Sequence, residues 1–439
     1  MEAKKKWDLI SVASIPLIMT LGNSMLIPIL PLIREKLAVT SFQVSLLITA
    51  YSLAAILLIP VAGFLSDRYG RKIVIIPSLI IAGIGGAVCG LAAWFMPHPY
   101  AIILAGRLLQ GIGAAGAAPV AMPLVGDMFT RESDVSSGLG LVETANTGGK
   151  VLSPILGSAL ASIIWFLPFL AIPVFCLISI LMVAFLVKNP AKAKKSKQEA
   201  SANPPDKEQE KQPSAPETRQ KSQEQEKPPV SLPVFIKELK WIFSKNGRWL
   251  YAIFAIGGIA MFLLFGSLFY LSELLEDKYK LSGILKGCVL AIPLSLLCIT
   301  SFITGKIIGQ HKKRMKWLTF AGCVLSLGAT LGSNFMTSSL PMLISMLSLL
   351  GIGIGLALPC LDAFITAGID KSQRGTISSF YSSMRFIGVA AGPPVVSLLL
   401  TRVPGWIFYV MAAACLIAAA LALFAIHPQT DVEQPAAGS

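Results

Sequence analysis

The chain has 439 residues, of which 54% are hydrophobic and only 14% are charged. A water-soluble protein of this composition would lack the polar residues to cover its surface. Runs of about 20 apolar residues recur along the chain, so we expect an all-α membrane protein. The formal net charge of +14 does not indicate nucleic-acid binding, because the basic residues stand beside the apolar runs and no aromatic–basic groove accompanies them.

Twelve segments are apolar and long enough to cross a membrane, and we expect each to form a transmembrane helix. A cluster of lysines precedes the first of them, which is too long for a cleavable signal. The segments predicted as spans are 9–31, 43–65, 73–94, 100–126, 137–160, 163–187, 249–271, 284–306, 317–336, 340–366, 375–400 and 404–426.

The charges between the predicted spans are distributed unequally. One side carries mostly basic residues, and the other side carries a mixture of both signs. By the positive-inside rule the basic side is cytoplasmic, so we expect both termini in the cytoplasm of a bacterial cell and a multi-pass protein of the plasma membrane. The basic side has Lys4–Lys6, Arg68, Arg71, Lys72, Arg131, Lys188–Lys197, Lys306–Lys316, Lys371 and Arg374.

One segment interrupts the apolar pattern. Residues 188–232 contain no aromatic residue and are rich in Lys, Glu, Gln, Pro and Ser, so we predict a disordered cytoplasmic linker. A solvated tether is its simplest role, and a regulatory or lipid-contacting role is the alternative. The expected domains are an N-terminal six-helix bundle (1–187), this linker, an amphipathic surface helix with a C-terminal six-helix bundle (233–426), and a cytoplasmic tail (427–439).

The two sets of six segments echo one another. The glycines from Gly111 to Pro119 recur from Gly351 to Pro359 in the corresponding segment of the second set. Such repetition is typical of transporters that bind their substrate near the midplane between two pseudo-symmetric bundles.

The loop between the second and third segments carries a charged motif, Gly63-Phe-Leu-Ser-Asp-Arg-Tyr-Gly-Arg-Lys72. Its alternative interpretation, a generic basic loop, does not explain the glycines and the acid. The motif resembles the signature of the major facilitator superfamily, a fold of twelve spans in two six-span halves. The resemblance implies a conformational lock in which Asp67 faces the start of the eleventh span near Gly375 and Arg71 pairs with Asp127. These contacts would hold the outward-open state. The lock residues are Gly63, Asp67, Arg68, Gly70, Arg71 and Asp127.

The fourth and fifth segments carry further motifs of that family. Arg107 stands where proton-coupled members are held to use an arginine in proton transfer, and a purely structural arginine is the alternative. The fifth segment resembles the motif of drug:proton antiporters, whose small residues let span 5 pack on span 8. The packing positions are Gly140, Gly149, Ser153, Pro154 and Gly157, with serine in place of glycine at two motif positions, Ser153 and Ser158.

A polar stripe on the fifth segment departs from ordinary apolar filling. Glu143, Asn146 and Lys150 share one helical face, and we expect that face to line a central cavity. A carboxyl in a low-dielectric cavity can load and release a proton near neutral pH, so Glu143 is our first candidate for the proton site. A buried pair that only fixes the helix register is the alternative. Asp362 is a second proton candidate, and the further cavity candidates are Arg385, Asn23 and Tyr381.

These features predict a secondary transporter, not an enzyme, that exports a drug or secreted metabolite in exchange for protons by alternating access. No P-loop for ATP is present in the sequence. We expect no cofactor and no metal, and the partners are protons, a small molecule and the lipid bilayer around a monomer. The charged cavity face favours a polar or anionic compound such as a siderophore, beside the lipophilic cations of multidrug efflux. The alternatives are uptake by proton symport, a lipid flippase, or more remotely a non-transporting sensor.

Overall fold

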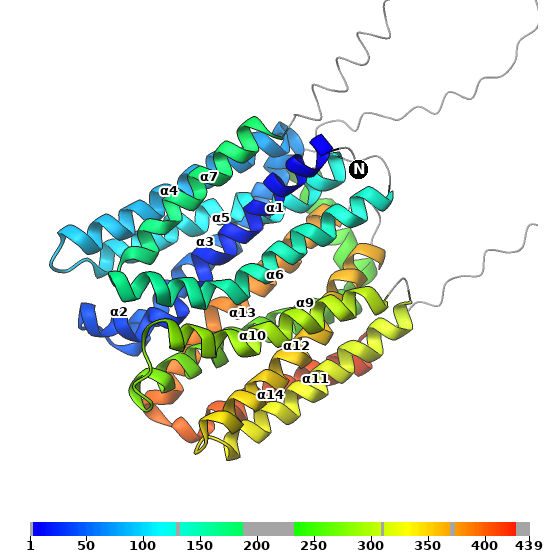
Figure 1. Cartoon of the computed structure of the whole chain (residues 1–439). Coiled ribbons are helices and arrows are strands. Elements are labelled where there is room, and N and C mark those ends of the chain that lie inside the picture. The colour runs from blue at the N-terminus through cyan, green and yellow to red at the C-terminus, as the bar shows by residue number, and fades with distance from the viewer. Residues whose placement is uncertain (1–2, 129–131, 188–231, 309–310, 369–373, 427–439) are drawn as a thin grey trace, which may run out of the picture.

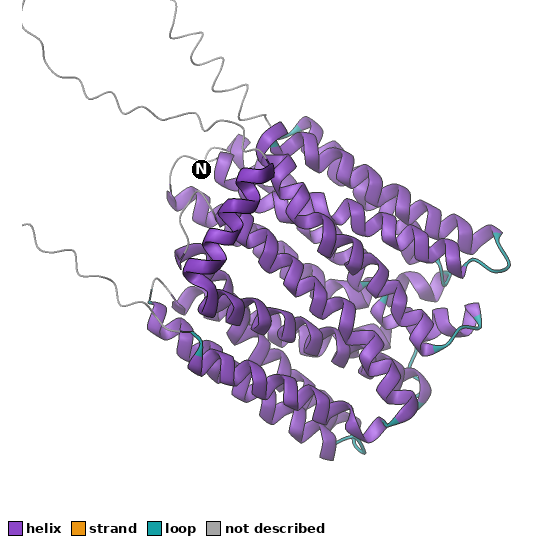
Figure 2. Ribbon diagram, turned by 180° about the vertical axis from the view of Figure 1, so that it is seen from behind, coloured by secondary structure: helices purple, strands orange, loops and turns teal. Residues whose placement is uncertain are grey.

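The computed structural model describes residues 3–128, 132–187, 232–308, 311–368 and 374–426, and these residues fold almost entirely as helices (Figure 2). The linker predicted at 188–232 lies outside the described residues except for its last position, as does the tail predicted at 427–439. Apolar segments form helices here because a bilayer offers no water to satisfy backbone N–H and C=O groups.

Seven helices and one short 3-10 turn form the first half of the molecule. Thr40 caps α3 by accepting a hydrogen bond from the Gln43 N–H at 3.1 Å. Gly70 separates α3 from α4 with a φ of 102°, which disfavours any residue with a side chain and so explains the glycine at this tight turn. The elements are α1 (Ala3–Ser24), η1 (Ile27–Ile29), α2 (Leu30–Leu37), α3 (Ser41–Tyr69), α4 (Arg71–Phe95), α5 (Tyr100–Met128), α6 (Glu132–Ile163) and α7 (Leu167–Phe185).

The second half repeats the long helices of the first. Its elements are α9 (Leu232–Asp277), α10 (Gly283–Ile308), α11 (Lys312–Phe335), α12 (Leu340–Gly368), α13 (Arg374–Arg402), η2 (Pro404–Trp406) and α14 (Ile407–Phe424). The predicted surface helix at 233–247 forms the first part of the continuous helix α9. The first predicted span also differs, because η1 interrupts it between α1 and α2, where Pro28 and Pro31 stand.

Two groups of helices lie side by side, α1 to α7 in one and α9 to α14 in the other (Figure 1). Across the boundary α6 packs along α10, and α3 packs along α13. Equivalent glycines make equivalent contacts in the two groups: Gly111 of α5 meets the backbone of α3, and Gly351 of α12 meets the backbone of α10. The internal repeat predicted from the sequence is therefore present in the packing.

Eleven helices among the described residues are long and apolar enough to cross a membrane. The predicted fifth span, which lies in α6, is not one of them, because its window carries the charged and small residues between Gly140 and Ser158. Yet α6 runs between α1 and α10 in the bundle, so it is the twelfth long helix of the fold. The predicted architecture of two pseudo-symmetric six-helix bundles is confirmed.

Candidate functional site

An open cavity of about 170 Å³ lies between the two halves. We call the end of the bundle at which α1 begins the N-terminal end, and the opposite end, where α2 lies, the far end. The lining positions of α6 and α13 fall in the parts of those helices nearer the N-terminal end. Both halves line the cavity. The second half contributes Phe265, Arg385 and Phe386, and the first half contributes Thr20, Asn23, Tyr51, Pro119, Glu143, Asn146 and Lys150.

The polar stripe predicted on the fifth segment faces this cavity. Thr20 of α1 donates a hydrogen bond to Asn146 Oδ1 at 2.6 Å, and Asn146 Nδ2 in turn lies 3.4 Å from Glu143 Oε1. The Thr147 hydroxyl lies 3.3 Å from the same carboxyl oxygen. Neutral donors therefore hold Glu143 at the cavity wall, and among the described residues it has no ion-pair partner.

The second half contributes a different arrangement. Arg385 of α13 forms an ion pair with Asp362 of α12 at 3.6 Å, and its guanidinium lies 5.6 Å from the centre of the Tyr381 ring. Tyr381 is buried and interacts with Asp362 electrostatically, but its hydroxyl has no well-aligned hydrogen-bond partner among the described residues. Arg385 lines the cavity, whereas Asp362 and Tyr381 are not among the lining residues.

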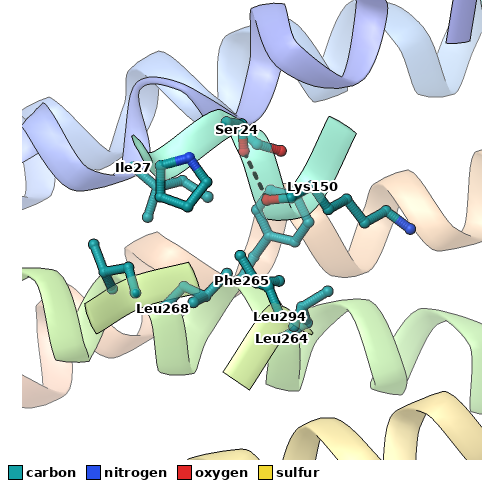
Figure 3. A pocket seen from close by; sticks show the side chains of 10 residues that line it. Ser24, Ile27, Lys150, Leu264, Phe265, Leu268 and Leu294 are labelled. Atoms are coloured by element: carbon teal, nitrogen blue, oxygen red, sulfur yellow. Dashed lines mark hydrogen bonds between the residues drawn. The ribbon is translucent and has the colours of Figure 1, made fainter. Parts of the chain in front are cut away.

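Lys150 stands at the junction of the cavity and a smaller apolar pocket. Figure 3 shows its side chain extending away from Leu264, Phe265, Leu268 and Leu294, which line that pocket. The ammonium group interacts electrostatically with Glu143 and Asp362 but forms no ion pair or hydrogen bond with any side chain that the structure describes. The structure thus brings Glu143, Lys150, Asp362 and Arg385 into one electrostatic group.

Arg107 lies outside this group. Its side chain is fully buried and bonds the Leu47 carbonyl at 3.0 Å, the Gly22 carbonyl at 3.2 Å and Asn23 Oδ1 at 2.9 Å. The guanidinium also stacks on the Tyr51 ring, 4.6 Å from its centre. These bonds tie α1, α3 and α5 together, which is the geometry of the structural alternative. Its part in proton transfer stays a prediction.

The predicted lock motif is partly assembled. Arg71 forms an ion pair with Asp67 and lies 3.1 Å from Asp127 Oδ2, the pairing that the resemblance implied. Both contacts lie within the first half, so they cannot by themselves tie the halves together. A Cβ at Gly63 would lie 2.8 Å from Ser379 Oγ of α13, which explains the glycine. Arg68 lies 5.6 Å from the ring centre of Tyr69, its neighbour in the chain.

The small residues of α6 pack against two helices. A Cβ at Gly149 would lie 3.2 Å from the Leu17 carbonyl, and Gly157 meets the Met25 carbonyl even more closely, so both face the chain of the first segment. The other side of α6 meets α10 of the second half, where Gly287 approaches the Pro154 carbonyl and, like Gly157, leaves no room for a Cβ. Ser153 is fully buried beside them. Gly140 differs, because no described atom lies within 4 Å of where its Cβ would be, so its predicted packing role finds no support.

Sequence reasoning did not anticipate the charge pairs at the far end. Arg34 of α2 forms ion pairs with Glu273 and, at 2.8 Å, with Asp277 of α9, which joins the two halves. Lys286 of α10 is buried and pairs with Glu276 at 2.8 Å. We call these five residues the far-end cluster. Lys286 could have been singled out from the sequence, because it is an ionisable residue inside the predicted span 284–306.

Two matched helical halves, a cavity between them that lies toward one end, and ion pairs across the other end define a membrane transporter. The sequence comparison agrees: the model of the Major Facilitator Superfamily matches residues 12–393 and, in a second match, 316–439. The chain belongs to this family, which confirms the resemblance found in its motifs.

Relatives in this family include exporters. The chain is 51% identical over 434 residues to the bacillibactin exporter of Bacillus subtilis (strain 168), a match that covers 98% of this chain and 99% of the relative. It is 23% identical over 173 residues to the quinolone resistance protein NorA of Staphylococcus aureus, covering 39% of this chain and 43% of the relative.

Solved structures share the fold at low sequence identity. The human organic anion transporter MFSD10 superposes with a TM-score of 0.69 at 18% identity, covering 96% of this chain and 100% of that protein. A bacterial homologue of the human lysosomal transporter Spinster, solved in an inward-facing and unoccupied conformation, gives a TM-score of 0.71 at 16% identity and covers 96% and 97% of the two chains.

Proposed function

We propose that this protein exports bacillibactin or a closely similar secreted metabolite from the cell in exchange for protons. The observation that carries the proposal is the match of 51% identity to the bacillibactin exporter, which extends over 98% of this chain. Identity at this level over nearly the whole length of both proteins includes the helices that line the cavity.

The direction of transport depends on the orientation of the bundle. We take the N-terminal end as cytoplasmic, because Arg68, Arg71, Lys72 and Lys306 lie there and the positive-inside rule favours that assignment. The cavity lies toward this end, and the contacts of Arg34 with Glu273 and Asp277 join the halves at the opposite end. On this assignment the conformation is open to the cytoplasm and ready to take up its cargo there.

Proton coupling is proposed to run through Glu143, which lines the cavity, and Asp362, which pairs with the cavity residue Arg385. Glu143 is held only by neutral donors, so it changes charge without breaking an ion pair. Asp362 is the second site, because loss of its charge frees Arg385. Protonation from outside favours one facing state and substrate binding favours the other, so that neither leaks alone.

The experiment compares export in a deletion strain complemented with the wild type or with Glu143→Gln. The wild type is expected to restore extracellular bacillibactin, and the variant to reduce its export at least tenfold because the glutamine cannot carry a proton. Collapse of the pH gradient with nigericin should reproduce the loss in the wild type. Glu35→Gln, an exposed acid at the far end, is the control and should export normally.

A second measurement distinguishes antiport from symport. Purified protein in liposomes that hold a pH-sensitive dye is given an outward gradient of bacillibactin. Antiport moves protons against the flow of substrate, so the lumen should acidify as the substrate leaves. Alkalinisation would contradict antiport and favour the symport alternative, and unchanged dye signal with substrate movement would exclude proton coupling.

A further inference from the structure

Lys150 lies at the boundary between two pockets. It lines both the open cavity and the adjoining apolar pocket, whose free space of about 10 Å³ is close to that of one water molecule. The helix α6 places it there, one turn beyond Asn146 on the same face. A molecule in the cavity can therefore meet the ammonium group, which points away from the smaller pocket (Figure 3).

The Lys150 ammonium group differs from the other cations inside the bundle, because no described side chain pairs with it. Arg385 has Asp362 at 3.6 Å, and Lys286 has Glu276 at 2.8 Å. A cation inside a membrane protein costs at least about 2.5 kcal/mol when nothing compensates it, so such residues are functional by default. The nearby carboxyl of Glu143 interacts with Lys150 electrostatically, but it is bonded to the neutral side chains of its own helix.

The charges facing Lys150 explain why a ligand anion fits beside it. Arg385 comes from the opposite half and repels Lys150, while Glu143 and Asp362 attract it without pairing. An anion placed between the two cations removes their repulsion and supplies the hydrogen-bond acceptor that Lys150 lacks. A cationic ligand gains no such partner and meets two positive charges instead.

The apolar part of the ligand must lie in the cavity itself, because the adjoining pocket has a free space of only about 10 Å³. The cavity has about 170 Å³, and its apolar lining includes Met261, Phe265 and Phe386. Apolar walls with a few polar groups are typical of sites that bind an aromatic or aliphatic body and orient it by polar contacts.

We propose that Lys150 determines substrate specificity by binding an acidic oxygen group of the cargo, while an apolar part of the same molecule lies against Met261, Phe265 and Phe386 in the cavity. The substrate class is an amphipathic organic anion, and organic cations are excluded. This inference rests on the proposed export function and names the chemistry that the cavity recognises.

A binding experiment tests the inference without any transport. Purified protein in detergent is titrated at pH 7 with 2-naphthoate or with its neutral counterpart 2-naphthamide, and the thermal unfolding midpoint is recorded. We expect naphthoate to stabilise the wild type more than naphthamide does. Lys150→Met should abolish the difference, and Lys150→Arg should keep it because the charge remains. Lys306→Gln, which lies at the membrane edge over Phe302, is the matched control and should behave as the wild type.

Equal shifts from the two naphthalene compounds in the wild type, or no shift from either, would overturn the inference. So would a preference for naphthoate that survives in Lys150→Met. None of these results depends on export, so the proposed function can fail in cells while the anion site stands, and the reverse also holds.

Transport in cells gives the second readout. Lys150→Met is expected to lower bacillibactin export at least tenfold and to raise efflux of ethidium, an organic cation, over the deletion strain. Bacillibactin export equal to that of the wild type in this variant would refute the specificity role even if naphthoate binds.

Discussion

The cavity and the far-end cluster both hold acids and bases inside the bundle, but they are built differently. At the far end Arg34 and Lys286 each contact an acid directly, and the pair of Lys286 with Glu276 spans only 2.8 Å. At the cavity the ion pair of Arg385 with Asp362 spans 3.6 Å, and Lys150 has no pair among the described residues. On the proposed function, the far-end charges are paired within the protein, whereas the cavity charges are left for a proton or a ligand.

The position of the two groups along the bundle gives the contrast a mechanical meaning. Within the far-end cluster the pairs of Arg34 join α2 of the first half to α9 of the second, so these pairs must separate when that end opens. Ser272 of α9 adds a hydrogen bond to the Ile27 carbonyl at 2.9 Å in the same region. The cavity group also draws on both halves, so its charge state can favour one arrangement of the halves over another.

The largest effect is expected from breaking a far-end pair on one side only. Glu276→Ala leaves Lys286, whose side chain is only 2% exposed, without its partner. Removing one partner of a buried pair costs about 3 kcal/mol, so the free energy of unfolding in detergent should fall by about that amount.

The double variant Glu276→Leu with Lys286→Met is the companion to that experiment, because replacing both charges with apolar side chains should restore most of the loss. Glu35→Ala, an exposed acid on α2, should change stability by less than about 0.5 kcal/mol. A double variant as unstable as the single one would show that the pair is not the source of the effect.

A smaller effect is expected from Arg34→Gln, which removes both ion pairs that join α2 to α9. The population in which the far end is open should then rise about tenfold. A tenfold change corresponds to about 1.4 kcal/mol of lost contact energy. Spin labels at Lys36 and Ser282, both exposed at the far end, report the distance between the halves in a cysteine-free background.

Glu35→Gln is the control for the spin-label measurement, since it removes a neighbouring charge without touching the pairs. A distance distribution in Arg34→Gln identical to that of the starting protein would mean that apolar contacts alone close this end.

The sequence predicts features that depend on neighbouring residues, but it does not predict contacts between residues far apart in the chain. The helices follow from apolar runs, and the cavity face of α6 follows from the spacing of Glu143, Asn146 and Lys150 on one helix. Both are local patterns. The pair of Arg34 with Glu273 joins residues far apart in the chain, and no periodicity within one helix points to it. The same holds for Arg385 with Asp362, which lie on different helices.

Arg107 shows a second limit. Its motif drew attention to the residue, but whether it serves proton transfer or structure depends on what surrounds the guanidinium. Its partners are Gln110 of the same helix and, from two other helices, the carbonyl groups of Gly22 and Leu47 and the Asn23 side chain. Carbonyl groups are present at every position, so no residue type marks them in advance.

The smallest effect on the free energy of unfolding is expected at Lys150, the counterpart of Lys286 without a pair among the described residues. Lys150→Met removes a cation that no described side chain pairs with, so no acid is deprived of a direct contact. The free energy of unfolding should therefore change by less than about 1 kcal/mol, and it can rise, because the methionine needs no compensation inside the bundle. Lys286→Met, measured in the same detergent, should lose more stability because Glu276 then stays without its cation. If Lys150→Met destabilises the protein as much as Lys286→Met does, Lys150 serves structure after all, and the distinction between paired structural charges and open functional ones fails at the residue that defines it.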